Sequence, residues 1–230
     1  MQSRQEIFIG KEKQEKLHKS TAAIVGLGGT GHAAAQYLAR SGVSLIIVDN
    51  DVVEKCNLGR QAYSRNDIGK PKAIVLKERL YEFCNIEARQ EILSSNNIDT
   101  IMSKADIILD GTDNFKTRFV INDYGIKHEI PFTYAAAIRS EAAFMMWLPG
   151  RPCLRCVFSG KKVNDSCEKD GVLAPVPAFI GTLSAIEAIK YFIDKKPVEG
   201  LMTFDFFKNK FGCLNLKKEK ICVCSGQEEI

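Results

Sequence analysis

The stretch Ala22-Ala23-Ile24-Val25-Gly26-Leu27-Gly28-Gly29-Thr30-Gly31-His32 decides the fold. A short apolar run leads into a G-x-G-x-x-G pattern, and an alanine-rich segment with strong helix propensity follows over residues 33–40. This order predicts a buried strand, a tight turn and a helix. We expect Gly26 to allow the turn, Gly28 to let a ligand approach the backbone, and Gly31 to let the helix pack on the strand. The free N–H groups at the helix start would then face an anion such as a nucleotide phosphate.

An acid stands where a nucleotide site needs one. A second apolar run, Leu45-Ile46-Ile47-Val48, ends at Asp49, 18 residues beyond Gly31. An acid at about this spacing reaches the ribose hydroxyls of a bound nucleotide. A glycine pattern alone is weak evidence. Strand, turn, helix and acid together favour a nucleotide site over a purely structural turn.

The composition is that of an ordinary soluble protein. The chain has 230 residues, of which 45% are hydrophobic and 26% charged, and its formal net charge is +4. The basic residues are spread out, so we expect no nucleic-acid partner. No apolar segment reaches the ~18 residues of a membrane span, and the polar N-terminus does not resemble a signal peptide. We therefore expect a cytoplasmic protein without membrane contact.

Strands and helices alternate through the first two thirds of the chain. Apolar runs predict strands over residues 22–25, 45–48, 86–92, 105–110, 131–137 and 142–148, with helices over residues 71–83 and 115–128, the second capped by Asn114 or Thr112. This alternation predicts an α/β fold with a Rossmann-like, mainly parallel sheet and helices on both faces. A helix over residues 179–193 and an antiparallel hairpin formed by residues 201–207 and 211–216 would follow.

We expect one domain over residues 1–230. It would comprise an N-terminal arm (residues 1–19), a nucleotide-binding core (20–149), a long loop (150–177) and a C-terminal helix with strands (178–230). A loop of that length inside a compact domain is usually functional.

Polar residues converge on one edge of the expected sheet. Asp49 and Asp110 end two strands, Asp113 follows the second, and a polar loop with Asn57 and Arg60 follows the first. Ligands of such folds bind beyond the carboxyl ends of the strands, next to the glycine turn. This convergence is better evidence for a site than any single motif.

Seven short motifs then fall in one order along the chain: Gly26-Leu27-Gly28-Gly29-Thr30-Gly31, Asp49-Asn50-Asp51, Asn57-Leu58-Gly59-Arg60-Gln61, Gly69-Lys70-Pro71-Lys72, Gly111-Thr112-Asp113-Asn114, Cys153-Leu154-Arg155-Cys156 and Gly171-Val172-Leu173-Ala174-Pro175. That order resembles the ThiF/MoeB/HesA family, relatives of the ubiquitin-activating enzymes. The match runs from Ser3-Arg4-Gln5 to the terminal cysteines, which is nearly the whole chain.

The resemblance implies an adenylation domain that uses ATP with Mg²⁺. In this family the C-terminal Gly-Gly carboxylate of a ubiquitin-like or sulfur-carrier protein attacks the α-phosphorus of ATP, which yields an acyl-adenylate and pyrophosphate. By the family pattern Asp49 holds the ribose, Asp113 coordinates Mg²⁺, and Arg4 resembles the arginine that reaches the ATP of the opposite subunit in a homodimer. The residues expected to bind the nucleotide are Gly26, Gly28, Gly29, Gly31, Asp49, Asp51, Asn57, Arg60, Lys72 and Asp113, with Asn57, Arg60 and Lys72 on the phosphates.

Elementary chemistry agrees with these roles, although plainer interpretations exist. Adenylyl transfer needs cations against the developing charge and a carboxylate to place the metal. No G-x-x-x-x-G-K-[ST] occurs, so side chains such as Lys72 and Arg60 would grip the triphosphate. Alternatively these two are surface cations, Asp113 is only a helix cap, and Arg4 is solvated. Arg118 is expected to be a structural ion-pair partner rather than a catalytic group.

Eight cysteines in such a chain indicate metal or thiol chemistry rather than a disulfide framework. Cys153 and Cys156 form C-x-x-C, and together with Cys222 and Cys224 they predict a structural Cys₄ zinc site that staples the long loop to the C-terminus. The second pair is C-x-C where the family has C-x-x-C. One of these two is therefore not necessarily a ligand, and Cys213 could substitute.

Cys167 lies in the long loop, near Lys161, Lys162 and Lys169. Neighbouring cations lower a thiol pKa and so favour the nucleophilic thiolate. In several relatives a cysteine at this place receives the activated carrier or forms a sulfur link with it. Other relatives work by adenylation alone, so both interpretations stay open.

Other functions compete with carrier adenylation. A nicotinamide (NAD)-dependent oxidoreductase would share the glycine turn and Asp49 but would not explain Arg60, Lys72 and Asp113. A non-catalytic subunit that binds a carrier is a third interpretation, and activation of a small-molecule or tRNA-borne carboxylate is a fourth. The sequence leaves the carrier and its pathway open among thiamin, molybdopterin, tRNA thiolation and protein tagging.

Overall fold

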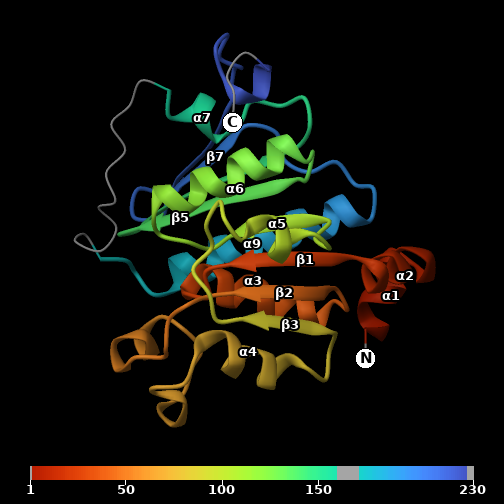
Figure 1. Cartoon of the computed structure of the whole chain (residues 1–230), viewed down its shortest axis with the longest axis vertical. Helices are drawn as coiled ribbons and strands as arrows, with labels where there is room; N and C mark the ends of the chain where they lie inside the picture. The colour runs from red at the N-terminus through yellow and green to blue at the C-terminus, as the bar shows by residue number, and fades with distance from the viewer. Residues whose placement is uncertain (1, 160–170, 227–230) are drawn as a thin grey trace.

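One mixed sheet organises the molecule. The computed structural model describes residues 2–159 and 171–226 (Figure 1). In these ranges the strands pair in the order β3-β2-β1-β4-β5-β6-β7-β8. They are β1 Thr21–Val25, β2 Ser44–Val48, β3 Ile86–Arg89, β4 Ile107–Asp110, β5 Phe132–Ile138, β6 Glu141–Trp147, β7 Leu201–Asp205 and β8 Lys210–Leu214.

Helices cover both faces of this sheet, as the sequence predicts. They are α1 Ser3–Ile9, α2 Lys11–Lys19, α3 Gly29–Arg40, α4 Lys72–Leu80, α5 Ile98–Met102, α6 Phe115–Lys127, α7 Leu154–Val157 and α9 Pro175–Phe192, with 3₁₀ turns η1 Lys55–Gly59, η2 Arg65–Asp67 and η3 Val223–Ser225. One hydrophobic cluster joins the sheet to α3, α4 and α9, and a second joins it to α5 and α6.

The central strands explain why the sequence reads as continuous apolar runs. In β1, Ala22 and Ile24 enter the first cluster, whereas Ala23 and Val25 enter the second. Successive side chains of a strand point to opposite faces, so a strand covered on both faces needs apolar residues throughout. Strands β1 to β5 pair in parallel, which places their carboxyl ends at one edge.

The antiparallel part is larger than a closing hairpin. The pairs β5–β6, β6–β7 and β7–β8 are all antiparallel. Only Arg139 and Ser140 separate β5 from β6, and Arg139 has a φ of 51°. Two residues can form a hairpin turn but cannot make the crossover that a parallel pair requires. The predicted hairpin is confirmed as β7 and β8. Because no helix lies between residues 137 and 142, strands β5 and β6 also pair in antiparallel fashion.

Several helix boundaries differ from the prediction. Helix α3 begins at Gly29 rather than at residue 33, because the glycine turn itself forms its first turn, with the His32 N–H donating to the Gly28 carbonyl at 3.0 Å. Helix α9 begins at Pro175, where proline suits a helix start. Helix α5 was not predicted, since five residues are too short for a clear periodicity.

The N-terminal arm consists of α1 and α2, which pack at the far end of α3. Gln14 donates a hydrogen bond to the Ser41 carbonyl at 2.9 Å, and Gln5 donates to the Gln14 side chain at 3.0 Å. Because α3 runs antiparallel to the strands, this end lies opposite the glycine turn (Figure 1). None of the helices in the described ranges combines the length and apolarity needed to cross a membrane.

Candidate nucleotide site and metal centre

Three glycines of the turn have no room for a side chain, and a Cβ on one of them, Gly29, would lie 2.7 Å from the Cβ of Pro177. Gly26 has a φ of 81°, and a Cβ on it would lie 2.9 Å from the carbonyl carbon of Gly111. A Cβ on Gly31 would lie 1.8 Å from the Gly26 oxygen. Gly28 is different, because a Cβ there would meet only the Gln61 Nε2, at 3.8 Å. The turn is therefore packed from behind and open at Gly28, which is the side from which a ligand can approach.

Asp49 lies at the end of β2 and is fastened to this turn. Its carboxylate accepts hydrogen bonds from the backbone N–H groups of Leu27, at 2.5 Å, and Asp51, at 2.7 Å. Burial raises the pKa of the Asp49 carboxyl above its usual range. The structure thus brings Asp49 to the glycine turn, where it orders the backbone.

Lys72 reaches the same edge from the first residue of α4. Its Nζ lies 2.8 Å from the Asp51 Oδ2, and its side chain is 6% exposed against 57% for Asp51. A surface cation would be solvated, so that interpretation of Lys72 is wrong. The ammonium is held inside the site by a carboxylate that itself faces solvent.

The loop after β2 packs against the start of α3. Asn57 is buried, and its Oδ1 accepts from the Glu54 N–H at 2.9 Å. The Tyr63 hydroxyl donates to the Leu27 carbonyl at 3.1 Å, and burial raises the pKa of this phenol. Arg60 is exposed, but its carbonyl lies only 3.2 Å from where a Cβ of Gly29 would be. The loop therefore presents the Arg60 guanidinium to solvent beside the helix start.

A buried ion pair supports the loop that carries Asp113. Asp110 and Arg118 are each 3% exposed, and their Oδ2 and Nε atoms lie 3.2 Å apart. Arg118 also donates to the Thr112 carbonyl at 2.6 Å. Burial raises the pKa of the Asp110 carboxyl, and the charge of Arg118 opposes that shift. The prediction that Arg118 is a structural ion-pair partner is confirmed.

Asp113 is exposed and is not the cap of α6. The cap is Asn114, whose Oδ1 accepts from the Thr117 N–H at 2.9 Å. The plain interpretation of Asp113 as a helix cap is therefore wrong. Its carboxylate is available to a ligand just beyond the carboxyl end of β4.

Two expected site residues are not brought to this edge in the part of the chain that is described. Arg4 is exposed on α1, at the opposite end of α3 from the glycine turn. A helix of this length spans ~18 Å, so Arg4 lies too far away to serve the site of its own chain. Cys167 lies outside the described residues, as do Lys161, Lys162 and Lys169.

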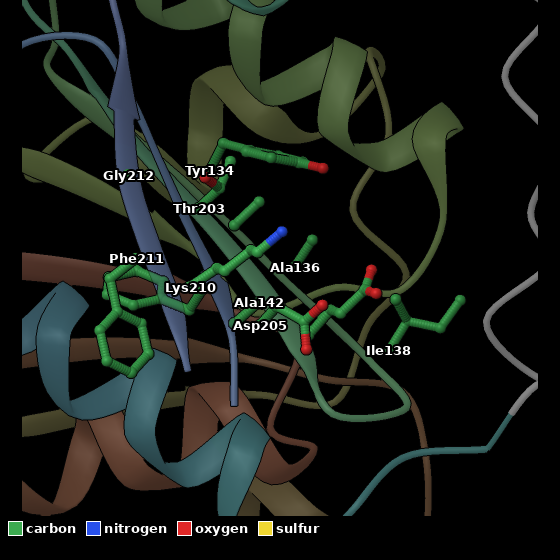
Figure 2. A pocket seen from close by; sticks show the side chains of 12 residues that line it. Tyr134, Ala136, Ile138, Ala142, Thr203, Asp205, Lys210, Phe211 and Gly212 are labelled. Carbon is green, nitrogen blue, oxygen red and sulfur yellow. The ribbon is translucent and has the colours of Figure 1, made fainter. Parts of the chain in front are cut away.

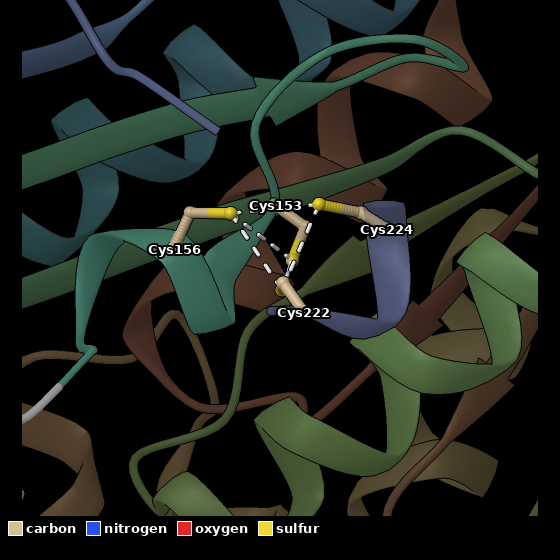
Figure 3. A group of neighbouring side chains, drawn as sticks. All are labelled: Cys153, Cys156, Cys222 and Cys224. Atoms are coloured by element: carbon tan, nitrogen blue, oxygen red, sulfur yellow. Dashed lines mark hydrogen bonds between the residues drawn. The ribbon is translucent and has the colours of Figure 1, made fainter. Parts of the chain in front are cut away.

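Four cysteines gather between α7 and η3 (Figure 3). Five Sγ–Sγ distances run from 3.5 to 4.0 Å among Cys153, Cys156, Cys222 and Cys224. A tetrahedron of thiolates ~2.3 Å from a zinc ion has edges of ~3.8 Å. The donor set therefore fits one tetrahedral metal ion. Both members of the C-x-C pair take part.

Cys213 does not join this group, and the suggestion that it substitutes for one ligand is wrong. It is exposed on β8, and its Sγ contacts the Glu199 carbonyl at 3.0 Å. Helix α6 anchors the segment that carries Cys153 and Cys156. Asn122 is fully buried and accepts from the Leu154 N–H at 2.9 Å. Asp123 pairs with Arg155 through both carboxylate oxygens.

A cavity of about 490 Å³ lies over the antiparallel strands β5 to β8 (Figure 2). Apolar residues such as Ala136 and Ala142 form part of its lining, and Glu141, Asp205 and Lys210 add charges. Tyr134 lines one end, and its ring centroid lies 5.0 Å from the Arg118 guanidinium carbon. The cavity therefore begins beside the ion pair under the Asp113 loop. Sequence reasoning missed it, because its lining comes from strands far apart in the chain.

Comparison with known proteins gives one consistent picture. The model of the ThiF family matches residues 2–225. The sulfur carrier protein adenylyltransferase of Thermus thermophilus is 33% identical, over 96% of this chain and 87% of that protein. The sulfur carrier protein ThiS adenylyltransferase of Escherichia coli K12 is 34% identical, over 95% of this chain and 91% of that protein. Among solved structures, E. coli MccB with ATP is 25% identical with a TM-score of 0.83, and the match covers 98% of this chain and 74% of that one.

Proposed function

The chain belongs to the ThiF family and is an adenylyltransferase, and we propose that it activates the C-terminal carboxylate of a ubiquitin-like or sulfur-carrier protein with ATP. The Thermus and E. coli relatives, which are named as sulfur carrier protein adenylyltransferases, support this substrate class. Family membership also favours ATP over the nicotinamide cofactor. The eight-stranded sheet supports the proposal that the chain forms one adenylation domain.

The convergence of charged side chains on the open side of the glycine turn carries this proposal. Gly26, Gly28, Gly29 and Gly31 would leave the first N–H groups of α3 free for phosphate oxygens. Asp49 would hold the ribose, and Lys72, Asn57 and Arg60 would contact the phosphates. Lys72 already lies in the site with Asp51 as its counter-ion. A triphosphate would replace part of that ion pair.

Magnesium binding is assigned to Asp113. Its carboxylate is exposed beyond β4 and makes no cap to α6, so its oxygens suit a hard cation. A bound Mg²⁺ would supply charge neutralisation for the triphosphate. The Asp110–Arg118 pair would position this loop through the hydrogen bond from Arg118 to the Thr112 carbonyl.

The reaction follows from these positions. A carboxylate oxygen of the carrier attacks the α-phosphorus, the bond from that phosphorus to the bridging oxygen breaks, and pyrophosphate leaves. Arg60 and Lys72 stabilise the negative charge that develops on the phosphates. The position of Arg4 at the far end of α3 supports its delivery from a second subunit, and hence a homodimer.

The cavity of Figure 2 is the proposed seat of the carrier tail. A Gly-Gly tail has no side chains and can pass through a narrow space. One end of the cavity lies at Tyr134, next to Arg118 and the loop of Asp113. A tail that enters over β7 and β8 would thus be led toward the glycine turn.

Two chemical roles remain proposals. Zinc is the metal that best suits four thiolates in tetrahedral arrangement, and four protein ligands leave no open position for catalysis. The ion would therefore be structural. Thioester or persulfide chemistry at Cys167 is proposed from the family resemblance. A Cys167→Ser variant that still transfers sulfur to its carrier at full rate would exclude it.

ATP–pyrophosphate exchange tests the function. We expect exchange that requires one Gly-Gly-tailed carrier, that is lost when the last glycine of the carrier is removed, and that is lost in Asp113→Ala. Asp99→Ala is the matched control, because Asp99 is exposed on α5 and pairs with His128 at the surface, away from the glycine turn. ATP binding without exchange on any carrier would favour a small-molecule substrate or a non-catalytic subunit. Exchange that survives Asp113→Ala would refute the role of Asp113.

A further inference from the structure

We propose that Gln61 is a further nucleotide-contacting residue, whose carboxamide Nε2 donates a hydrogen bond to a phosphate oxygen at the start of α3. This inference rests on the proposed function, because it places one more contact in the same ATP site. Gln61 ends the motif Asn57-Leu58-Gly59-Arg60-Gln61, in which only Asn57 and Arg60 were given a phosphate contact above.

The first observation is where unsatisfied polar atoms occur. Within the described ranges, four buried side-chain atoms have no hydrogen-bond partner, and two of them, Asp110 Oδ2 and Arg118 Nε, face each other at 3.2 Å in the ion pair described above. The other two are His32 Nδ1, in the first turn of α3, and Gln61 Oε1. Buried polar groups are otherwise almost always paired. Both of these side chains lie next to the glycine turn, as expected of a site built for a polar ligand.

The second observation is the direction of the Gln61 side chain. Gln61 is 7% exposed, and its backbone N–H is held by the Asn57 carbonyl at 2.9 Å. Apart from residues 27–29, its Nε2 is the one atom of the described residues within 4 Å of the position that a Cβ of Gly28 would occupy. The amide therefore borders the open side of the turn. A ligand that approaches Gly28 must pass this nitrogen.

The third observation concerns the ligand. Gly28 caps α3 without any side-chain hydrogen bond to the first-turn N–H groups. Those groups and the positive end of the helix dipole favour an anion. An amide N–H beside them adds a donor to the same anion, and a hydrogen bond to a charged group is stronger than one to a neutral group. A phosphate oxygen of the nucleotide is the group that this set of donors fits.

Energetics explain why a glutamine would be kept here. A buried amide oxygen without a partner costs free energy in the unliganded protein. Within the described residues no hydrogen bond holds the Gln61 Oε1, so the terminal torsion of the amide can adjust when the phosphate arrives. The side chain therefore lowers stability and raises affinity. A structural glutamine would do the opposite.

This contrast gives a sharp experiment with a matched control. The full-length protein and its Gln61→Met, Gln61→Glu and Gln14→Met variants are titrated calorimetrically with α,β-methylene ATP, and their melting temperatures are measured. Gln14 is also buried, but it is hydrogen-bonded to Ser41 and Gln5 at the far end of α3. We expect Gln61→Met to weaken binding by about 10-fold or more without a lower melting temperature. Gln14→Met should melt earlier and bind the analogue as the wild type does.

The remaining outcomes separate the two proposals. Gln61→Glu should bind even more weakly than Gln61→Met, because a carboxylate repels the phosphate. Wild-type affinity in either Gln61 variant, or a lower melting temperature together with weak binding in Gln61→Met, would overturn the role of Gln61 and leave the adenylyltransferase function standing. If the folded wild type itself fails to bind the analogue, the proposed function falls together with this inference.

Discussion

His32 is expected to make the stability of this protein depend on pH below neutrality. The imidazole is 2% exposed in the first turn of α3, its Nδ1 has no partner, and the ring packs edge-on against Tyr63 at 4.6 Å. Burial, and then the charge of Arg79, lower the pKa of His32 from 6.5 to about 4. Its Nε2 lies 3.3 Å from the amide nitrogen of Gln36. No carboxylate contacts the ring within the described residues, so a proton on it would be uncompensated.

The sign of the effect follows from proton binding. The unfolded chain takes up a proton on this residue near pH 6.5, whereas the folded protein does so only near pH 4. The unfolded state therefore binds more protons in this window, and acidification stabilises it. The stability that depends on a neutral His32 is present above pH 6.5 and is lost as the pH falls toward 4. From these two values the free energy of unfolding drops by about 1 kcal/mol between pH 7 and 5.5 and by about 3 kcal/mol by pH 4.

Urea unfolding at pH 7 and 5.5 measures this change. We compare the wild type with His32→Phe and His32→Gln, and only the change with pH is read, so a different stability of the variants at pH 7 does not matter. Both variants should lose about 1 kcal/mol less than the wild type over this interval. His128→Gln is the control, since His128 lies at the surface beside Asp99. Equal pH dependence in wild type and both His32 variants would refute the reasoning.

Three further predictions follow from the packing of the site and the metal centre. Gly31→Ala places a Cβ 1.8 Å from the Gly26 oxygen, so it should lower the free energy of unfolding by about 1–3 kcal/mol or more and abolish ATP binding. Gly59→Ala is the control and should fold normally, because a Cβ there has nothing within 4 Å. Comparable melting curves for the two variants would contradict this. Cys224→Ser should reduce bound metal in elemental analysis, and Cys213→Ser should not; full metal content in Cys224→Ser would show that only three thiolates are needed. Asn122→Ala leaves the Leu154 N–H unpaired, so metal release to a chelator should be faster and stability lower by about 1–3 kcal/mol; an unchanged release rate would exclude this anchor.

The sequence predicted the nucleotide-binding half of the fold for a local reason. Strand, turn and helix in the glycine stretch follow each other without interruption, and the contact that excludes a Cβ on Gly31 comes from Gly26 in the same stretch. Gly26 has a positive φ of 81°, which is also a local property of the turn. The parallel strands were equally clear, because burial on both faces requires unbroken apolar runs. Boundaries were less reliable, as at α3, where the turn residues themselves are helical.

The candidate site could be predicted only as a set of residues at one sheet edge. Lys72 was open to interpretation as a surface cation until its burial against Asp51 was seen. Asp113 and Asn114 are neighbours in the chain, and the structure decides which of them caps α6. The C-x-C pair raised a doubt that the sulfur positions remove. In each case the role of the residue depends on the direction of its side chain in the folded protein.

By itself, then, the sequence determined the α/β fold, the glycine turn, the carboxylates beyond the strands and the two cysteine pairs, because each depends on residues close together in the chain or on the two-fold period of a strand. Tertiary structure alone decided that four thiolates from segments about 70 residues apart form one centre, that a cavity lies over β5 to β8, and that Gln61 borders Gly28 without a partner. The physical reason is that the burial and the hydrogen bonds of a side chain depend on the residues around it, and those residues come from segments that meet only when the chain folds.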